Sequence, residues 1–323
     1  MEKTILKKIL KIFLISSVSI LAVVALMKLS GRSLENFFIW RFSSNRDLFS
    51  ASFLNVLSST KPIRNWEVED LDLEVESALS AEIDSAGQKK ILFKRNEDKP
   101  LPIASLTKLM TALVVLEDYD ASHLASVSSE AVSQEGFQGE LKVGETLSVE
   151  NLLYIMLMES SNDAAYALSE VLGKDAFVAL MNLKAKVIGL SNTTFVNPTG
   201  LDSVEENGPM NYSTTEDLIK LTHYILKKEP LVFRILSLKE FHLYRPDGTY
   251  HHKLVNTNEL IGQVPDIVGG KTGWTPKARG CLLLILDNPI KNGYLVYIIL
   301  GSDNNRFEEM KKMIDWTNNA YTW

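Results

Sequence analysis

The sequence predicts an α+β fold, in which strands at the two ends of a folded body enclose helices that lie between them along the chain. Extended runs occur at 76–84 and 90–95, and strand-like segments return from about residue 235. Apolar-rich segments typical of helices fill the interval. We therefore expect a sheet layer combined with an all-helical part.

The N-terminal part of this body begins with a hairpin signal. Ser85-Ala86-Gly87-Gln88 separates the first two extended runs. After Pro100 and Pro102 break the chain, an apolar-rich run predicts a long helix over 104–116. Asp163 and Asp175 stand where the start of a helix favours negative charge. Further helices are predicted at 150–159, 163–172, 175–188 and 215–228.

The C-terminal part returns to strands. Segments 237–244 and 249–255 flank Pro246-Asp247-Gly248, which is a strong turn signal. Segments 281–287 and 294–300 form a second predicted pair. A helix from Arg306 to Trp316 closes the predicted fold.

Composition excludes some functions. The net charge of -6 gives no support to nucleic-acid binding, because phosphates require a positive surface. Cys281 is the single cysteine, so no intrachain disulfide can form. It lies in an apolar run and is expected to be a buried hydrophobic residue rather than a nucleophile.

The N-terminus has the features of a membrane-targeting segment. Four lysines within the first eleven residues precede an apolar stretch from Ile12 to Met27. With its flanks the stretch approaches the roughly 20 residues that a spanning helix needs. A cleaved signal peptide is the alternative, but the bulky Leu26 and Met27 do not resemble a cleavage site. We favour a single-pass anchor over 1–30, with the lysines in the cytoplasm and the rest of the chain outside.

A connector follows the anchor. Residues 31–75 show no sustained period, and aromatic residues between Phe37 and Phe42 are suited to a membrane interface. The folded body is predicted to occupy 76–323. Its residues include five histidines but no HExxH or similar spacing, so a metallopeptidase is not supported. His251 and His252, as neighbours in a strand, are expected to point to opposite faces and to flank a hairpin.

Ser105-Leu106-Thr107-Lys108 is the first motif that could carry chemistry. A serine hydroxyl becomes a nucleophile when a base takes its proton, and a neutral lysine can do so. A spacing of three places both side chains on one face of a helix. A helix start after Pro102 would leave the Ser105 N–H free to face an oxyanion. Burial or a second cation, for which Lys271 is available, would favour the neutral lysine.

This spacing alone is weak evidence. Ser58-Ser59-Thr60-Lys61 has the same pattern, but it precedes Pro62 in the connector and has no helix to align it.

Ser160-Ser161-Asn162 is the second motif, between two predicted helices. A hydroxyl on such a turn can relay a proton, and an amide can bind a substrate peptide. The ordinary interpretation of this pattern is a helix cap, and Ser43-Ser44-Asn45 shares it.

Lys271-Thr272-Gly273 is the third motif. In a strand it would offer a cation and a hydroxyl to a carboxylate, and the next N–H to an oxyanion. Gly273 would let a substrate backbone approach closely. A glycine-rich turn before a buried strand is the alternative interpretation.

The combination is more specific than any one motif. The three occur in order at a helix start, an inter-helix turn and a late strand, and the second copies do not meet that condition. Together they resemble the signature set of penicillin-binding proteins and serine β-lactamases. Over about 76–323 the chain resembles the low-molecular-mass D-alanyl-D-alanine carboxypeptidases, peptidase family S11. Matching stretches are Ala104 to Ala112, Ser161 to Ala165, Phe195 to Leu201, Ser213-Thr214, Lys271 to Thr275, Leu300 to Ser302 and Arg306 to Trp316.

The resemblance implies a transpeptidase-like fold, with an antiparallel sheet flanked by helices and an inserted all-helical subdomain. It also implies that the penultimate D-Ala of a peptidoglycan stem peptide acylates Ser105 while the terminal D-Ala leaves. Lys108 resembles the general base and Ser160 the proton relay. No cofactor or metal is implied, and β-lactams are expected inhibitors.

The same resemblance implies a set of substrate contacts. Asn162 would contact the substrate amide, and Lys271 and Thr272 would face the terminal carboxylate. The N–H groups of Ser105 and Trp274 would form the oxyanion hole. Arg306 lies where the family places an arginine near the carboxylate.

Some features depart from the family pattern. Many members carry a second, β-rich domain and a C-terminal amphipathic anchor, so here the N-terminal segment is expected to provide the membrane attachment. Arg279 stands where a small residue is common, and Trp274 occupies a variable position.

Three related functions remain alternatives. Class A β-lactamases add a glutamate within Glu-x-x-Leu-Asn, which is absent between Asn162 and Lys271. A D,D-endopeptidase that cuts cross-links would share every motif. A β-lactam sensor would acylate without turnover.

Overall fold

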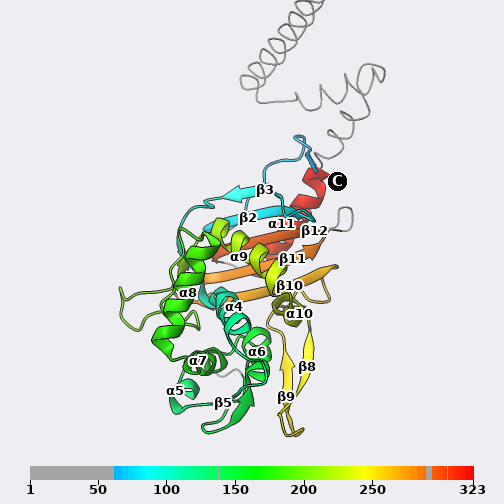
Figure 1. Cartoon of the computed structure of the whole chain (residues 1–323). Helices are drawn as coiled ribbons and strands as arrows, with labels where there is room; N and C mark the ends of the chain where they lie inside the picture. The colour runs from blue at the N-terminus through cyan, green and yellow to red at the C-terminus, as the bar shows by residue number, and fades with distance from the viewer. Residues whose placement is uncertain (1–61, 137–138, 289–292, 304) are drawn as a thin grey trace, which may run out of the picture. The chain divides into compact units, whose positions relative to one another are not determined.

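The computed structural model describes residues 62–136, 139–288, 293–303 and 305–323 (Figure 1). These residues fall into two compact units, one of which is 71–317. The other contains the pairing of β1 (Ile63–Arg64) with β13 (Tyr321–Thr322). The predicted anchor, residues 31–61 of the connector and both second motif copies lie outside the described residues. Within the described part, no helix is long and apolar enough to span a bilayer.

The larger unit is built on a five-stranded antiparallel sheet. Its central strand β12 comes from the C-terminal part of the chain and pairs with β2 from the N-terminal part, so the two predicted hairpins join into one sheet. Both hairpins are confirmed. The strand order is β10 (Ile267–Thr275), β11 (Arg279–Asp287), β12 (Gly293–Ser302), β2 (Ser77–Asp84) and β3 (Lys89–Arg95).

Helices cover both faces of this sheet, which explains why β11 and β12 are apolar almost throughout. On one face, α9 (Thr215–Lys228) packs against β2 and β12. On the other face, α11 (Arg306–Ala320) places Trp316 edge-on to Phe93 of β3, with ring centroids 5.4 Å apart. The predicted closing helix is confirmed.

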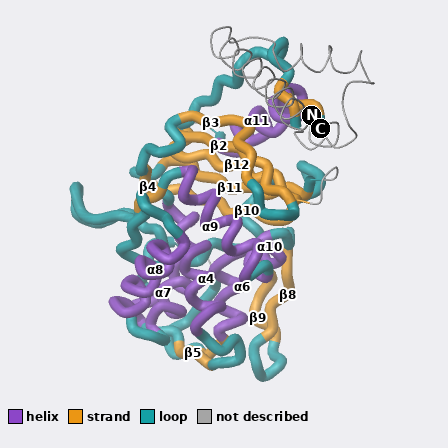
Figure 2. The backbone as a smooth tube through the Cα atoms, turned by 45° about the horizontal axis from the view of Figure 1, so that its top comes forward, coloured by secondary structure: helices purple, strands orange, loops and turns teal. Residues whose placement is uncertain are grey.

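An all-helical part lies beside the sheet (Figure 2). At its centre, α4 (Lys108–Asp118) is buried continuously from Lys108 to Val115, because other helices surround it. The predicted helices at 150–159, 163–172, 175–188 and 215–228 are confirmed. The surrounding helices are α6 (Val149–Met158), α7 (Asn162–Glu170), α8 (Lys174–Ile188) and α10 (Leu231–Leu236).

Two predicted boundaries are wrong. The helix predicted over 104–116 begins as a 3-10 turn, η2 (Ala104–Thr107), because Pro102 still belongs to β4 (Leu101–Pro102) and pairs with β7 (Tyr212–Ser213). The strand predicted from 237 begins at Glu240, since the apolar run before it forms α10 after Pro230. Besides β1, β4, β7, α10 and β13, the short elements that the sequence did not predict include β5 (Leu124–Ser126), α5 (Ser129–Val132) and β6 (Thr146–Ser148).

The hairpin predicted around Pro246-Asp247-Gly248 is confirmed as β8 (Glu240–Tyr244) and β9 (Tyr250–Val255). It extends away from the five-stranded sheet alongside α6 (Figure 1).

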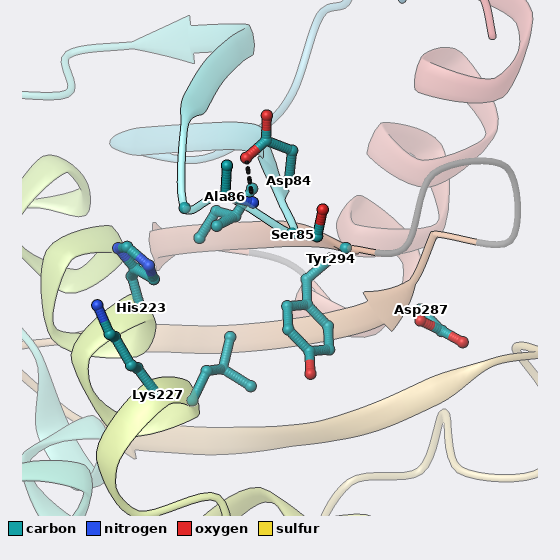
Figure 3. A pocket seen from close by; sticks show the side chains of 11 residues that line it. Asp84, Ser85, Ala86, His223, Lys227, Asp287 and Tyr294 are labelled. Atoms are coloured by element: carbon teal, nitrogen blue, oxygen red, sulfur yellow. Dashed lines mark hydrogen bonds between the residues drawn. The ribbon is translucent and has the colours of Figure 1, made fainter.

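A pocket of about 510 Å³ lies at one end of the sheet (Figure 3). The β2–β3 turn lines one side, where Asp84 Oδ1 accepts a hydrogen bond from the Ala86 N–H. His223 and Lys227 of α9 line another side, with Asp287 and Tyr294 from the ends of β11 and β12. None of the predicted motif residues lines this pocket, so it is separate from the predicted catalytic groups.

Candidate active site

Ser105 and Lys108 meet as their spacing predicts. The 3-10 turn carries Ser105, and Lys108 begins α4, so Lys108 Nζ lies 2.8 Å from Ser105 Oγ. The turn starts at Ala104 with φ of 44°, a left-handed conformation that is uncommon for a residue with a Cβ. This conformation lets the chain pass from the short strand β4 into the 3-10 turn within two residues, and it places Ser105 at the start of that turn.

Lys108 is fully buried and has three oxygen neighbours. Besides Ser105 Oγ, its Nζ lies 2.7 Å from both Asn162 Oδ1 and the Thr199 carbonyl oxygen. Burial, and then the charge of Lys271, hold the pKa of Lys108 well below its usual value. A neutral amine has two N–H donors and one lone pair. Those donors suit the amide and carbonyl oxygens, which leaves the lone pair for the Ser105 proton.

The Thr199 carbonyl is held in place by a tight loop. Asn197 Oδ1 accepts hydrogen bonds from the Thr199 hydroxyl at 3.1 Å and from the Gly200 N–H at 2.7 Å. Gly200 has φ of +88°, and a Cβ there would lie 2.0 Å from the Ala104 carbonyl oxygen. Only glycine therefore lets this loop approach the nucleophile turn.

Ser160 faces the second buried lysine. Lys271 Nζ, on β10, donates to Ser160 Oγ at 2.8 Å and to the Thr272 carbonyl at 3.0 Å. Ser160 has φ of 62° in the turn between α6 and α7. The next residue, Ser161, is the helix cap, since its Oγ accepts from the Ala164 N–H. Capping and the contact with Lys271 thus belong to different serines.

Asn162 is held between Lys108 and the backbone of Glu135. Its Oδ1 contacts Lys108, and its Nδ2 donates to the Glu135 carbonyl at 2.7 Å, which fixes the orientation of the amide. One N–H of the amide remains for another acceptor.

Lys271 lies in a cationic environment. Burial, followed by the charge of Arg306, lowers the pKa of Lys271 to about 7. Arg306 is itself half-buried, and its buried Nε has no hydrogen-bond partner among the described residues. An anion would compensate both groups.

The rest of β10 lies along the nucleophile turn. Thr272 Oγ1 lies 2.6 Å from Thr257 Oγ1. A Cβ on Gly273 would lie 3.1 Å from the Ser105 nitrogen, so the strand backbone runs close to that N–H. The Trp274 side chain is 61% exposed. Cys281 is buried on the neighbouring strand β11, where it pairs with Gly273, and burial raises the pKa of its thiol to about 11, as expected for an inert cysteine.

The structure thus joins Ser105, Lys108 and Asn162 through direct contacts, and it joins Ser160 to Lys271 in the same way. The two sets are close enough for the charge of Lys271 to lower the pKa of Lys108, and Thr272 and Gly273 lie on the same strand as Lys271. Sequence reasoning missed the contacts of Thr199, Glu135 and Thr257. Only the turn-forming Asn-Pro-Thr-Gly sequence at 197–200 could have drawn attention to the first of these. Arg279, whose identity departs from the family pattern, pairs with Glu76 and Asp303 and touches none of the catalytic side chains.

Comparison with known proteins agrees with this arrangement. The family model for D-alanyl-D-alanine carboxypeptidase, peptidase S11, matches residues 65–304. The chain belongs to the S11 peptidase family. Among its relatives, D-alanyl-D-alanine carboxypeptidase DacF of Bacillus subtilis is 32% identical over 259 residues, which are 78% of this chain and 64% of the relative. A D-alanyl-D-alanine endopeptidase of Pseudomonas aeruginosa is 35% identical over 210 residues, which are 64% of this chain and 66% of that protein.

Solved structures of the family share the fold. D-alanyl-D-alanine carboxypeptidase from Mycobacterium tuberculosis has a TM-score of 0.70 at 26% identity, over 80% of this chain and 96% of that one. Penicillin-binding protein D2 from Listeria monocytogenes, in its ampicillin-bound form, has a TM-score of 0.65 at 30% identity, over 77% and 99%. The predicted transpeptidase-like α+β fold is confirmed. The matched part of the chain corresponds to slightly less than two thirds of the length of the Bacillus subtilis and Pseudomonas aeruginosa relatives.

Proposed function

We propose that the chain is a serine-type D-Ala-D-Ala carboxypeptidase that removes the terminal D-Ala from peptidoglycan stem pentapeptides. The observation that carries the proposal is the buried Lys108 Nζ, 2.8 Å from Ser105 Oγ and with two further acceptors that suit a neutral amine. This arrangement provides a nucleophile and its base in one contact.

The reaction has two halves. Lys108 takes the Ser105 proton while Ser105 Oγ attacks the carbonyl carbon of the penultimate D-Ala. The bond to the terminal D-Ala nitrogen then breaks, and that nitrogen receives, through the Ser160 hydroxyl, the proton that Lys108 took from Ser105, so Lys108 is neutral again. A water molecule, losing a proton to Lys108, attacks the resulting ester and returns the hydroxyl to Ser105. The Ser105 and Trp274 N–H groups stabilise the oxyanion in both halves.

Recognition of the substrate depends on its terminal carboxylate. Lys271, Thr272 and Arg306 supply two cations and a hydroxyl. Among the residues that the structure describes, Arg306 Nε has no hydrogen-bond partner, which supports a place for an anion. The Asn162 amide contacts the substrate backbone through its remaining N–H. The carboxylate of a β-lactam would use the same groups, so penicillins are expected to acylate Ser105.

The test combines adduct mapping with product release. Purified protein should bind fluorescent penicillin covalently at Ser105, and it should release D-Ala from a monomeric pentapeptide. Mass spectrometry that finds no adduct on Ser105 would exclude the mechanism. An adduct without D-Ala release would instead indicate a β-lactam sensor, and rapid turnover of the penicillin would indicate a β-lactamase.

A D,D-endopeptidase is the second candidate. It is favoured by the endopeptidases of Pseudomonas aeruginosa and Escherichia coli, each 35% identical to this chain over 210 and 211 residues respectively. Assays on a pentapeptide and on a cross-linked peptide dimer, side by side, decide between the two. Faster cleavage of the dimer would replace the carboxypeptidase assignment.

We further propose that residues 1–30 anchor the protein as a single-pass segment, with the catalytic body on the extracytoplasmic side. The proposal rests on the four lysines before the apolar stretch from Ile12 to Met27. The full chain should resist extraction with alkaline carbonate, and its catalytic body should be digested by protease added to intact spheroplasts. Release of a shortened chain into the medium would indicate a cleaved signal peptide instead.

A further inference from the structure

The β8–β9 hairpin contains a bulge that brings two histidines together. His242 pairs with Lys253 and Tyr244 pairs with Tyr250, so Leu243 alone stands opposite both His251 and His252. In a regular strand, neighbouring side chains would point to opposite faces, as the sequence predicted. The extra residue turns both rings to the same side, where their centroids are 4.6 Å apart and their Nδ1 atoms are within hydrogen-bond distance. That prediction was wrong because an alternating pattern does not reveal a bulge.

A carboxylate lies at each end of this pair. His252 Nε2 is 3.0 Å from Oε2 of Glu159, the last residue before Ser160. His251 Nε2 is 3.2 Å from Oε1 of Glu145. All four side chains are at most 15% exposed. The chain of contacts therefore runs from Glu145 through the bulge to Glu159, largely shielded from water.

The two carboxylates differ in their other partners. Glu145 Oε1 also accepts from Arg245 Nε at 3.0 Å, and Glu145 Oε2 accepts from the Lys142 N–H at 3.2 Å. Glu159 has only a long contact, 3.4 Å, from the Val255 N–H besides His252 among the described residues. Glu159 consequently has the greater need of a hydrogen-bond donor from the histidines.

These partners determine which ring nitrogens carry protons. A hydrogen bond between two Nδ1 atoms requires one N–H and one lone pair. If His252 Nε2 donates to Glu159, neutral His252 accepts at Nδ1, and His251 must donate from its own Nδ1. His251 Nε2 then carries no proton, and Arg245, which donates to the same Glu145 Oε1, compensates the negative charge that this nitrogen faces. Burial, which lowers the pKa of His251, also favours its neutral form.

Ser160 needs support of this kind. Its φ of 62° is unfavourable for a residue with a Cβ and persists only where its neighbours fix it. On its C-terminal side Ser161 is fixed by capping α7. On its N-terminal side Glu159 ends α6, and its side chain is held by His252.

We propose that His251 and His252 are positioning residues for the reaction. His251 donates a hydrogen bond to His252, and His252 donates one to Glu159. These two bonds fix the backbone of Ser160 so that its hydroxyl reaches Lys271. The charged groups that face the two rings are Glu145 before β6, Glu159 at the end of α6 and Arg245 at the end of β8. This inference rests on the proposed role of Ser160 as proton relay.

The experiment compares His252→Ala with His252→Gln, and uses His242→Ala as the matched control. His242 lies on the exposed side of the same hairpin. Acylation by fluorescent penicillin is followed by stopped-flow fluorescence. This measurement gives two quantities: the dissociation constant of the noncovalent complex that forms first (the first complex) and the rate constant of acylation. His252→Ala should slow acylation about tenfold and leave the dissociation constant within about twofold. Glutamine can donate to Glu159 and accept from His251, so His252→Gln should recover most of the rate, to within about threefold.

Further variants keep the outcomes distinct. Glu159→Ala removes the hydrogen-bond acceptor of His252, and it should slow acylation about tenfold, as expected for His252→Ala. Because Glu159 is the more exposed of the two carboxylates, this variant tests the inference even if His252→Ala does not fold. Acylation at the His242→Ala rate in both variants would overturn the inference, and so would a His252→Gln variant as slow as His252→Ala. Ser160→Ala tests the underlying role: if it acylates like the unmodified protein, the relay role itself is wrong.

Discussion

The two buried lysines of the site differ in what surrounds them, although each is fully buried. Lys108, on the helix side, is enclosed by three fixed oxygens from three separate segments of the chain. Lys271, on the strand side, contacts the Ser160 hydroxyl and the neighbouring Thr272 carbonyl, with Arg306 nearby. Both pKa values are lowered chiefly by burial. A second cation adds to the effect in each case, Lys271 for Lys108 and Arg306 for Lys271, and the pKa of Lys271 is lowered to about 7.

This difference separates two tasks. A base must be neutral before substrate arrives, and the surroundings of Lys108 already accommodate a neutral amine. A carboxylate-binding group must be able to become a cation, and a pKa of about 7 lets an arriving anion shift Lys271 to its charged form. The helix side is thus prepared for proton removal and the strand side for binding.

The largest expected effect is on the helix side. Lys108→Met keeps the size of the side chain and removes the base, so acylation of Ser105 by penicillin should slow by about 10³-fold or more, with first-complex binding little changed. Stopped-flow fluorescence measures both quantities. Lys186→Met, at an exposed position of α8, is the control and should behave as the unmodified protein. Acylation of the Lys108→Met variant at an undiminished rate would remove Lys108 from the mechanism.

On the strand side the effect should be smaller and should appear in binding. Lys271→Met removes one of the cations that face the carboxylate, so KM for D-Ala release should rise more than kcat falls, by about 10- to 100-fold. Lys271→Arg keeps a cation and should recover part of the affinity. Steady-state assays on a pentapeptide provide both constants. A fall in kcat alone would mean that Lys271 belongs with Lys108 in proton transfer.

The pH dependence sharpens the same contrast. Because the pKa of Lys271 is lowered to about 7, the lysine loses its charge as pH rises through that value. First-complex binding of penicillin should therefore weaken by about tenfold between pH 7 and about pH 8.5. A penicillin methyl ester, which lacks the carboxylate, should show no such dependence, and Lys271→Arg should abolish it. If binding of the ester weakened equally between pH 7 and about pH 8.5, the pH dependence would belong to a group other than Lys271.

The sequence predicted the local contacts of the site better than the contacts that depend on the tertiary fold. The contact between Ser105 and Lys108 follows from a spacing of three at a helix start, which is a local property. The carbonyl oxygens of Thr199 and Glu135 could not be predicted as partners, because any residue has a carbonyl and only the tertiary fold brings those two to the site. The bulge at His251 was missed for a related reason: one extra residue in a strand leaves no mark on composition.

The smallest expected effect concerns Thr257, which connects the hairpin to the strand side. Its Oγ1 lies 2.6 Å from Thr272 Oγ1, and its N–H donates to the Met158 carbonyl at 3.0 Å. Thr257→Val removes only the first contact, so the Thr272 hydroxyl should lose its fixed orientation and KM should rise about threefold with kcat unchanged. Thr249→Val is the control, since Thr249 Oγ1 bonds Asp247 on the exposed turn of the same hairpin. Equal KM values for the two variants would show that the carboxylate is bound without help from an oriented Thr272 hydroxyl, leaving Lys271 and Arg306 as the whole of the strand-side contribution.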